Sequence, residues 1–472
     1  MRVLVAIANH GTSNDRFVRR LIEAYRSMSH DVSIVLLSNI EKDVGPDIEV
    51  AVGLPSENPW SLPFAYKQIF FDRRDDFDLF IYSEDDTLIS ERNIDAYFEA
   101  EAVLPHDHIA GFIRHEIGED GTVYYSTVHG SYHWDPASVM VAGGEVFASF
   151  TNEHAAAFML SKAKLAACID SGGFMREPYE ARYDMLCSAA TDPYTQCGLN
   201  KVVCISRIDD FSLHHLPNKY IGKIGVLKPE IDRHLAKLIE ISSGQGARDS
   251  LVDGRVRVSF SSRYDRVYFS DPFPSIMSVM PDRPCRILSI ACDCGRTEAI
   301  LAERGHTIDA IPLDPVIAES ARMRGVNVLD VDLTDPAKSV APDSYDLLLF
   351  HFCLPFIEDP AAFISAFTSA LRGDGQILVP FWNWQALKEQ RQRYRERKTS
   401  AEAADVGIYE RSGLHRTDAK TVIAWLENSG FGIESLAYDV PRSGAAASRW
   451  SGGILDRWLA RTGTVLSTAK GL

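Results

Sequence analysis

The chain has 472 residues, of which 46% are hydrophobic and 24% charged, and this composition is typical of a globular protein with two or three domains. The net charge of −16 argues against a nucleic-acid partner, because phosphate backbones are bound by clustered positive charge. The sequence has no apolar run long enough to span a membrane and no secretory signal pattern, so we expect a cytoplasmic protein, with peripheral attachment to a membrane left open. The eight cysteines lack CxxC or zinc-type spacing, which favours reduced thiols.

The first 220 residues predict an α/β domain, because strand-like apolar runs alternate with helical patterns. The strands are expected at 2–8, 31–38, 78–83, 108–116 and 200–207, and the helices at 13–28, 63–75, 92–104, 152–170 and 179–190. A helical piece followed by a break rich in Gly, Ser and Asp predicts a connector over 221–283. A second alternation of strands and helices then covers 284–472.

Three adjacent acids, Glu84, Asp85 and Asp86, follow the third predicted strand of the first domain. Ligands of open α/β sheets bind beyond the carboxyl ends of the strands, so these acids lie where a nucleotide and a divalent cation would be placed. Carboxylate oxygens suit Mg²⁺ or Mn²⁺. The alternative interpretation is a solvated loop, because acids are common in loops.

The order strand, helix, strand, helix, strand, acids resembles the GT-A class of nucleotide-sugar glycosyltransferases, whose DXD motif occupies this place. The resemblance covers residues 1–220 and implies that Glu84 and Asp86 bind the metal. It places Asn9 and Asp85 at the nucleotide. A metal-bound diphosphate is stabilised as it leaves the sugar.

The resemblance also implies a catalytic acid on the predicted helix 179–190, where Asp184 fits best and Glu180 second. The two acids are four residues apart and would share a helix face. Either would take a proton from an acceptor hydroxyl, unless both are ordinary surface acids. After the next strand, His214 or His215 is expected as an additional metal ligand, with a surface or capping role as the alternative.

Residues 284–472 resemble a class I S-adenosylmethionine (SAM)-dependent methyltransferase, beginning with "RILSIACDCGRTEAILAERG". The resemblance implies a Rossmann-like fold and a glycine-rich loop that approaches the cofactor. The positions that the family uses for contact are altered: the acid ending the first strand is Ser289, two glycines are Ala291 and Asp293, and the ribose-binding acid is Pro312.

Three residues of this domain remain as candidate cofactor contacts: Gly295, Asp314 and Asp332. The acids that the family has at positions 289 and 312 are absent from this chain. Losing these two charge-assisted contacts, of roughly 1.5–3 kcal/mol each, weakens SAM binding by orders of magnitude. We therefore expect poor SAM binding and a role in assembly or acceptor presentation. The competing interpretation is an active methyltransferase with unusual contacts, acting on the glycan that the first domain builds.

The sequence thus predicts a metal-dependent glycosyltransferase domain over 1–220 and a methyltransferase-like domain over 284–472. The expected partners are a nucleotide-sugar donor, Mn²⁺ or Mg²⁺, and a glycan or lipid-linked acceptor. The pairing suggests polysaccharide biosynthesis by analogy. Two alternatives are kept: a methyltransferase whose first domain binds sugar, and a scaffold without catalytic activity.

Overall fold

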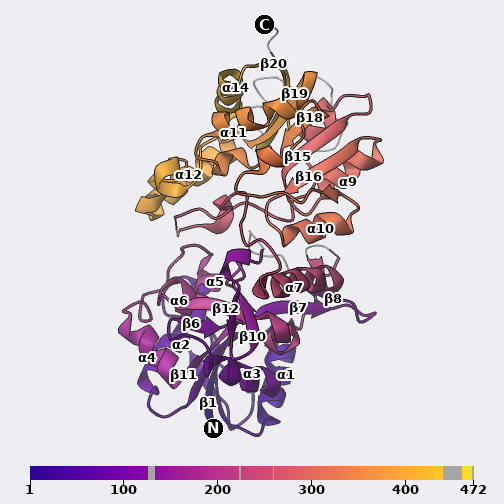
Figure 1. Ribbon diagram of the computed structural model, residues 1–472. Helices are drawn as coiled ribbons and strands as arrows, with labels where there is room; N and C mark the ends of the chain where they lie inside the picture. The colour runs from indigo at the N-terminus through magenta and orange to yellow at the C-terminus, as the bar shows by residue number, and fades with distance from the viewer. Residues whose placement is uncertain (126–132, 223–224, 259, 440–459, 470–472) are drawn as a thin grey trace. The chain divides into compact units, whose positions relative to one another are not determined.

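The computed structural model describes residues 1–125, 133–222, 225–258, 260–439 and 460–469. The chain divides into two compact units, Met1–Gln245 and Gly246–Leu472 (Figure 1). The segment expected as a connector is shared between them, with 221–245 in the first unit and 246–283 in the second. Within the described residues, none of the helices has both the length and the apolar character needed to cross a bilayer. All eight cysteines are buried and carry free thiols.

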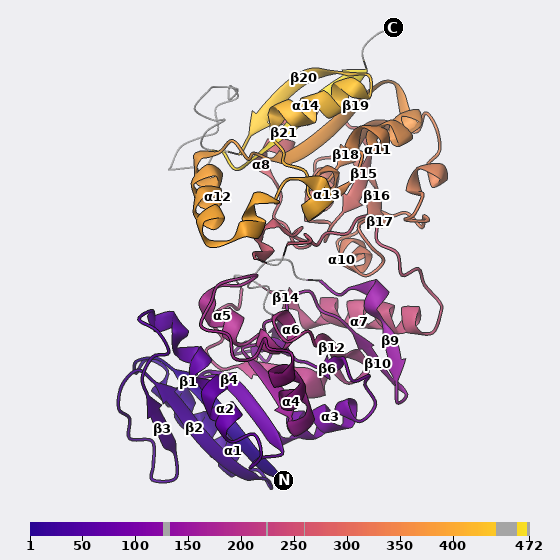
Figure 2. The same cartoon turned by 90° about the vertical axis from the view of Figure 1, so that its left-hand side faces the viewer.

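The first unit is built on a five-stranded sheet in the order β11-β4-β1-β2-β3, whose strands β1 to β4 can be followed in Figure 2. Its strands are β1 Arg2–Asn9, β2 Asp31–Ser38, β3 Glu49–Val52, β4 Leu79–Glu84 and β11 Ala157–Ser161. All pair in parallel except β11, which runs antiparallel to β4. The three strands predicted first are confirmed. The short edge strand β3 was not predicted, so the acid cluster follows the fourth strand rather than the third.

The helices of the first unit lie close to the predicted positions, with two exceptions. They are α1 Asp15–Arg26, α2 Tyr66–Asp72, α3 Glu91–Glu101, α4 Lys162–Asp170, α5 Met185–Ala189, α6 Asp192–Thr195 and α7 Lys228–Ser242. A single helix over 152–170 is wrong, because its apolar half pairs with β4 as β11 and Ser161 caps α4. A helix over 179–190 is also wrong, since Asp184 is extended and α5 begins only after it.

Two smaller sheets complete the first unit. The first has the order β6-β12-β10-β9, and the second the order β14-β8-β7-β13-β5. Their strands are β5 Thr87–Leu88, β6 His108–Ala110, β7 Ile113–Ile117, β8 Val123–Tyr125, β9 Met140–Ala142, β10 Glu145–Ala148, β12 Asn200–Cys204, β13 Ser212–His215 and β14 Val226–Leu227. The single strand predicted over 108–116 is therefore two strands in different sheets.

The second unit contains a seven-stranded sheet in the order β17-β16-β15-β18-β19-β21-β20. The strands are β15 Arg286–Cys292, β16 Thr307–Pro312, β17 Asn327–Val328, β18 Tyr345–Phe350, β19 Leu371–Trp382, β20 Phe431–Tyr438 and β21 Thr462–Ala469. Only β21 is antiparallel to both neighbours, β19 and β20. A largely parallel sheet accompanied by helices is the Rossmann-like arrangement expected for this segment, and the α/β fold class is confirmed.

Seven α-helices accompany this sheet in the described residues, and several are labelled in Figure 1. They are α8 Pro274–Val279, α9 Arg296–Glu303, α10 Ile317–Met323, α11 Pro360–Phe367, α12 Leu387–Thr399, α13 Tyr409–Ser412 and α14 Ala419–Asn428. Gly295 precedes α9 with a φ of +84°, and a Cβ added there would lie 2.8 Å from the Ala321 backbone. The turn between β15 and α9 therefore requires glycine at this position.

Candidate functional site

The acid cluster lies at the carboxyl end of β4 and lines a cavity of about 450 Å³ in the first unit. This volume falls within the range of small-molecule sites. The cavity collects side chains from both ends of the unit's sequence, and many of them are polar or charged. The ionisable groups that line it are His10, Glu84, Asp85, Asp86, Arg114, His154, Asp184, Cys187, His215, Lys219 and Tyr220.

Asp85 is fixed by two asparagines from the first strand and the first helix. Asn9 and Asn14 each donate a side-chain hydrogen bond of 2.7 Å to one oxygen of the Asp85 carboxylate. Burial raises the pKa of Asp85 to about 6, against the lowering effect of these two hydrogen bonds. Asn9 and Asp85, which are both expected at the nucleotide, are therefore in direct contact, although Asn9 does not line the cavity.

Asp86 and His215 form the best pair of candidate metal ligands. His215 Nε2 lies 3.4 Å from Asp86 Oδ2, and the Asp86 side chain is 9% exposed. The other oxygen, Asp86 Oδ1, is buried without a hydrogen-bond partner among the described residues. On its far side, His215 Nδ1 lies 2.6 Å from the buried carboxylate of Glu116. This carboxylate fixes the ring orientation and leaves Nε2 facing Asp86.

Strand pairing explains why His215, and not His214, reaches the acids. In the antiparallel pair β5–β13, His215 is opposite Thr87, the residue that follows Asp86. Successive side chains of a strand point to opposite faces, so His214 faces away from the cavity. It stacks on His115 at 5.3 Å and does not line the cavity. Burial lowers the pKa of His214, as expected for a neutral packed imidazole.

Glu84, the third acid, pairs with a buried histidine. His154 Nε2 lies 3.0 Å from Glu84 Oε1, and both residues line the cavity. The Glu84 side chain remains 27% exposed, so it is open to the cavity as well as to His154. Of the metal ligands predicted from the sequence, Glu84, Asp86 and His215 are brought together and His214 is not.

The two predicted catalytic acids, Asp184 and Glu180, do not share a helix face, because α5 begins only after Asp184. Asp184 caps α5 by accepting a hydrogen bond of 2.9 Å from the Cys187 backbone, and it lines the cavity. Glu180 is exposed in a non-helical segment and does not line the cavity. The neighbouring Cys187 is a poor nucleophile, because burial raises the pKa of its thiol.

Several site residues were not identified from the sequence. Arg114 and Lys219 bring positive charge to the cavity lining, and Arg114 lies 5.9 Å from the Tyr220 ring centroid. Arg114 and Glu116 are two residues apart on β7, so they project from the same face. This alternation in "IRHEI" was the available signal for both. Lys219 lies four residues after His215, at the end of "HHLPNK", and carries no pattern of its own.

The residues of this cavity fit a divalent cation. The donor set is carboxylate oxygen and imidazole nitrogen, which Mn²⁺ and Mg²⁺ sites accept, with nitrogen favouring Mn²⁺. The buried Asp86 Oδ1 has no other described partner, and His215 presents a nitrogen beside it. Asp86 and His215 would hold the ion, with Glu84 at the open side of the cavity.

In the second unit, the three remaining candidate cofactor contacts have local structural roles. Asp314 caps α10, because its Oδ1 accepts from the Val316 and Ile317 backbones at 2.7 and 3.0 Å. Asp332 is exposed and accepts two hydrogen bonds from Thr334. Gly295 makes the turn before α9. These local roles account for the three residues without a bound cofactor, and the prediction that they contact SAM stays a prediction.

The carboxyl ends of β15 and β16 are covered by the chain itself. We call residues 251–258 and 264–268 the covering segment. Leu251 donates to the Leu313 carbonyl at 2.7 Å, and the Tyr268 carbonyl accepts from Cys294 at 3.1 Å. The buried guanidinium of Arg266 donates to the Ala291 carbonyl at 3.0 Å. The segment therefore occupies the edge where the altered glycine loop and the ribose position lie.

Apolar packing reinforces this cover. Val252, Val256 and Tyr268 are buried in one cluster with Ile311 and Leu313. Ala291 stands at a glycine position with a φ of +66°, and its carbonyl is held by Arg266. A SAM molecule at this edge would have to displace buried side chains and hydrogen bonds. The residues present do not fit SAM.

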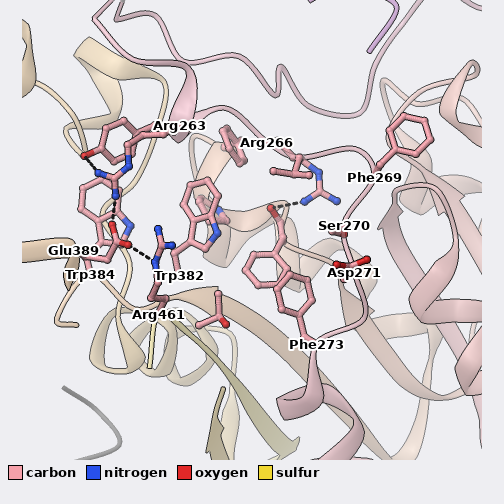
Figure 3. A pocket seen from close by; sticks show the side chains of 16 residues that line it. Arg263, Arg266, Phe269, Ser270, Asp271, Phe273, Trp382, Trp384, Glu389 and Arg461 are labelled. Carbon is pink, nitrogen blue, oxygen red and sulfur yellow. Dashed lines mark hydrogen bonds and ion pairs between the residues drawn. The ribbon is translucent and has the colours of Figure 1, made fainter. Parts of the chain in front are cut away.

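A cavity of about 460 Å³ remains beside the ends of β18 and β19 (Figure 3). Its lining is aromatic and arginine-rich, and Arg263 and Arg461 both pair with Glu389. Arg266 lies on the opposite wall and donates to the Phe352 carbonyl at 3.2 Å. The larger lining residues are Tyr264, Phe269, Phe273, Phe352, Phe356, Trp382 and Trp384.

Comparisons with known proteins return matches among solved structures. No protein-family model matches the chain, and no curated protein matches it significantly. A Thermotoga maritima protein described as a SAM-dependent methyltransferase and possible histamine N-methyltransferase is 17% identical, with 42% of this chain and 87% of that one covered and a TM-score of 0.31. A Mesorhizobium loti SAM-dependent methyltransferase is 20% identical, with 41% of this chain and 96% of that one covered and a TM-score of 0.30.

A Listeria monocytogenes protein described as a putative SAM-dependent methyltransferase is 18% identical, with 42% of this chain and 96% of that one covered and a TM-score of 0.31. At TM-scores near 0.3, no conclusion about the fold or the chemistry of this chain follows from these likenesses. Its fold assignment rests on the strand order of the second unit.

Proposed function

We propose that the first unit is a metal-dependent glycosyltransferase that moves a sugar from a nucleotide-diphosphate donor to a glycan or related acceptor. The observation that carries this proposal is the single cavity lined by Glu84, Asp85, Asp86, Asp184 and His215. Carboxylates and an imidazole at the carboxyl end of a parallel strand suit a divalent cation and a phosphorylated ligand. The GT-A assignment of this unit remains part of the proposal.

The cavity offers complementary charge to a donor diphosphate. Asp86 and His215 would hold Mn²⁺ or Mg²⁺, which neutralises the diphosphate as the sugar bond breaks. Arg114 and Lys219 supply two further cations on the lining. Phosphate oxygens between the metal and these side chains would be bound from two sides.

Asp184 is the proposed general base. It is exposed at its end of the cavity, so it can receive an acceptor hydroxyl from solvent. In an inverting reaction it removes the hydroxyl proton while the acceptor oxygen attacks the anomeric carbon. Trp60, also on the lining and 49% exposed, presents an aromatic face of the kind that stacks on a nucleobase or sugar ring.

The test is a panel of nucleotide sugars incubated with the full chain and Mn²⁺, with release of the nucleoside diphosphate as the readout. Asp86→Ala is expected to abolish metal-dependent release. Glu180→Ala is the matched control, because Glu180 is an acid that the structure places outside the cavity. Binding of no nucleotide sugar in the presence of Mn²⁺, or unchanged turnover of Asp86→Ala, would refute the proposal.

The fold of the second unit favours another candidate function, a SAM-dependent methyltransferase whose first unit binds a sugar substrate. The strand order and the cavity in Figure 3 support it, and the covered ends of β15 and β16 oppose it. Titration of the full chain with SAM decides between them. Saturable binding at micromolar SAM would establish this candidate, and its absence would leave the second unit without methyl-transfer chemistry.

A further inference from the structure

Three ionisable side chains meet in the interior of the second unit, apart from both cavities described above. Asp293 follows β15, Glu298 lies in α9 and His351 follows β18. One nitrogen or oxygen atom from each lies within 4.8 Å of the other two. Their exposed fractions are 1%, 0% and 0%. Three different elements therefore converge on one buried polar point.

The hydrogen bonds among the described residues leave this cluster incomplete. Both ring nitrogens of His351 and one carboxylate oxygen of Glu298 have no hydrogen-bond partner there. His351 Nδ1 lies 3.6 Å from Glu298 Oε1, which is too long for a hydrogen bond. Two buried carboxylates beside an unpartnered imidazole are costly, because buried charge must be paired or bound to a metal.

We infer that Asp293, Glu298 and His351 bind a divalent transition-metal ion, with zinc as the expected ion. Two carboxylates balance its charge, and the imidazole supplies a nitrogen donor that zinc favours over the oxygen-seeking Ca²⁺ and Mg²⁺. Binding would use the unpartnered Glu298 Oε2 and a ring nitrogen of His351. The third ligand is Asp293, whose Oδ1 accepts a long hydrogen bond of 3.4 Å from the Gly295 backbone. This site is independent of the proposed glycosyltransferase site, which lies in the other unit.

Two serines already orient the carboxylates. Ser289 donates to Glu298 Oε1 at 2.6 Å, and Ser270 donates to Asp293 Oδ2. Outer hydrogen bonds of this kind hold the ligands of metal sites in place. Each carboxylate thus has one oxygen held by a serine, while Glu298 Oε2 is left for the ion.

The inference also accounts for two of the altered positions in the methyltransferase-like motif. Ser289 stands where the family has an acid, and Asp293 stands where it has a glycine. In this chain the first holds a proposed ligand and the second is itself a proposed ligand. The altered loop would therefore contribute to a metal site that joins β15, α9 and the end of β18.

The experiment measures zinc in the full-length chain carrying Asp86→Ala, so that the first-unit site does not contribute. Protein from zinc-supplemented cells is dialysed and assayed by plasma mass spectrometry. One equivalent of zinc is expected, and it should be lost when His351→Gln or Asp293→Asn is added. His306→Gln is the matched control, because His306 is a buried histidine of the same unit outside the cluster. It should retain the zinc.

A second measurement avoids dependence on the folding of the variants. Zinc is removed from the Asp86→Ala chain with a chelator and then restored, and Tm is recorded at each step. A fall and recovery of several degrees is expected, because a ligand that binds only the folded state stabilises it. Absence of stoichiometric zinc together with an unchanged Tm would overturn the inference, as would zinc retention by His351→Gln equal to that by His306→Gln.

Discussion

Replacing Glu116 with glutamine tests whether the first-unit site binds metal through a positioned histidine. Glu116 Oε1 lies 2.6 Å from His215 Nδ1, and both side chains are 1% exposed. Its other oxygen accepts from the Tyr220 backbone at 2.9 Å. Glutamine keeps the volume but removes the charge, and it has only one oxygen to serve these two donors. The ring of His215 therefore loses its fixed orientation or its basicity.

Loss of an outer partner of a metal-binding histidine lowers metal affinity about 10- to 100-fold, or about 1.4–2.7 kcal/mol. We expect the upper part of this range, because the contact is short, buried and made to a carboxylate. The assay is Mn²⁺ binding followed by electron paramagnetic resonance of the free ion. His215→Gln should weaken binding further than Glu116→Gln, since it removes the ligand itself.

His214→Gln is the matched control, because His214 is the adjacent histidine on the opposite face of β13. It should leave the Kd for Mn²⁺ close to that of the unaltered protein. If Glu116→Gln leaves this Kd unchanged, or if His214→Gln weakens binding as much as His215→Gln, the arrangement of metal ligands described here is refuted.

Asp184→Asn should lower kcat for sugar transfer roughly 10²- to 10⁴-fold with little effect on donor binding, and Glu180→Gln should leave both unchanged in steady-state kinetics. Burial raises the pKa of the Asp85 carboxyl from 3.8 to about 6. Between these two pH values the unfolded chain has lost the Asp85 proton while the folded chain still holds it. The free energy of unfolding of the metal-free protein should therefore fall as pH rises from 3.8 to about 6. Asp85→Asn should remove this fall, which amounts to about 3 kcal/mol at 1.36 kcal/mol per pKa unit. The measurement is urea unfolding of the unaltered protein and of Asp85→Asn at pH 4 and 7. The same change in unfolding free energy in both proteins would contradict the prediction. Calorimetric titration of the full chain with SAM should give no saturable binding, and Arg266→Ala should lower Tm without creating such binding, since the guanidinium is part of the core.

Much of the first-unit site could be predicted from the sequence, because its elements are local signals. The run before Glu84 is continuously apolar, as expected for a central parallel strand, and the polar residues after it mark the carboxyl edge of the sheet. The choice between His214 and His215 depended on the register of β13 against β5, which joins residues far apart in the chain. Register between distant strands leaves no local pattern.

The errors also have physical causes. The run "AAAFMLSKAKLAACID" contains a five-residue apolar strand directly followed by a helix, and periodicity alone does not separate these states. Asp184 was placed within a helix, whereas it is extended and caps the helix that follows. In the second unit, the altered motif lies at the carboxyl end of β15, beside the covering segment. The covering segment was not foreseen, because the strand-like run "GRVRVSF" within residues 251–268 does not reveal which edge of the sheet it covers.

The covering segment determines where the chain can be truncated to give a folded second unit. A fragment that starts at Pro284 would contain every strand of the seven-stranded sheet but would lack Val252, Val256 and Tyr268, which are buried against it. Ile311 and Leu313 would then face water, and the Ala291 carbonyl would lose its guanidinium partner. Such a fragment should aggregate or bind hydrophobic dyes. A fragment that starts at Gly246 keeps these contacts, so the physical beginning of the second unit lies well before its first strand.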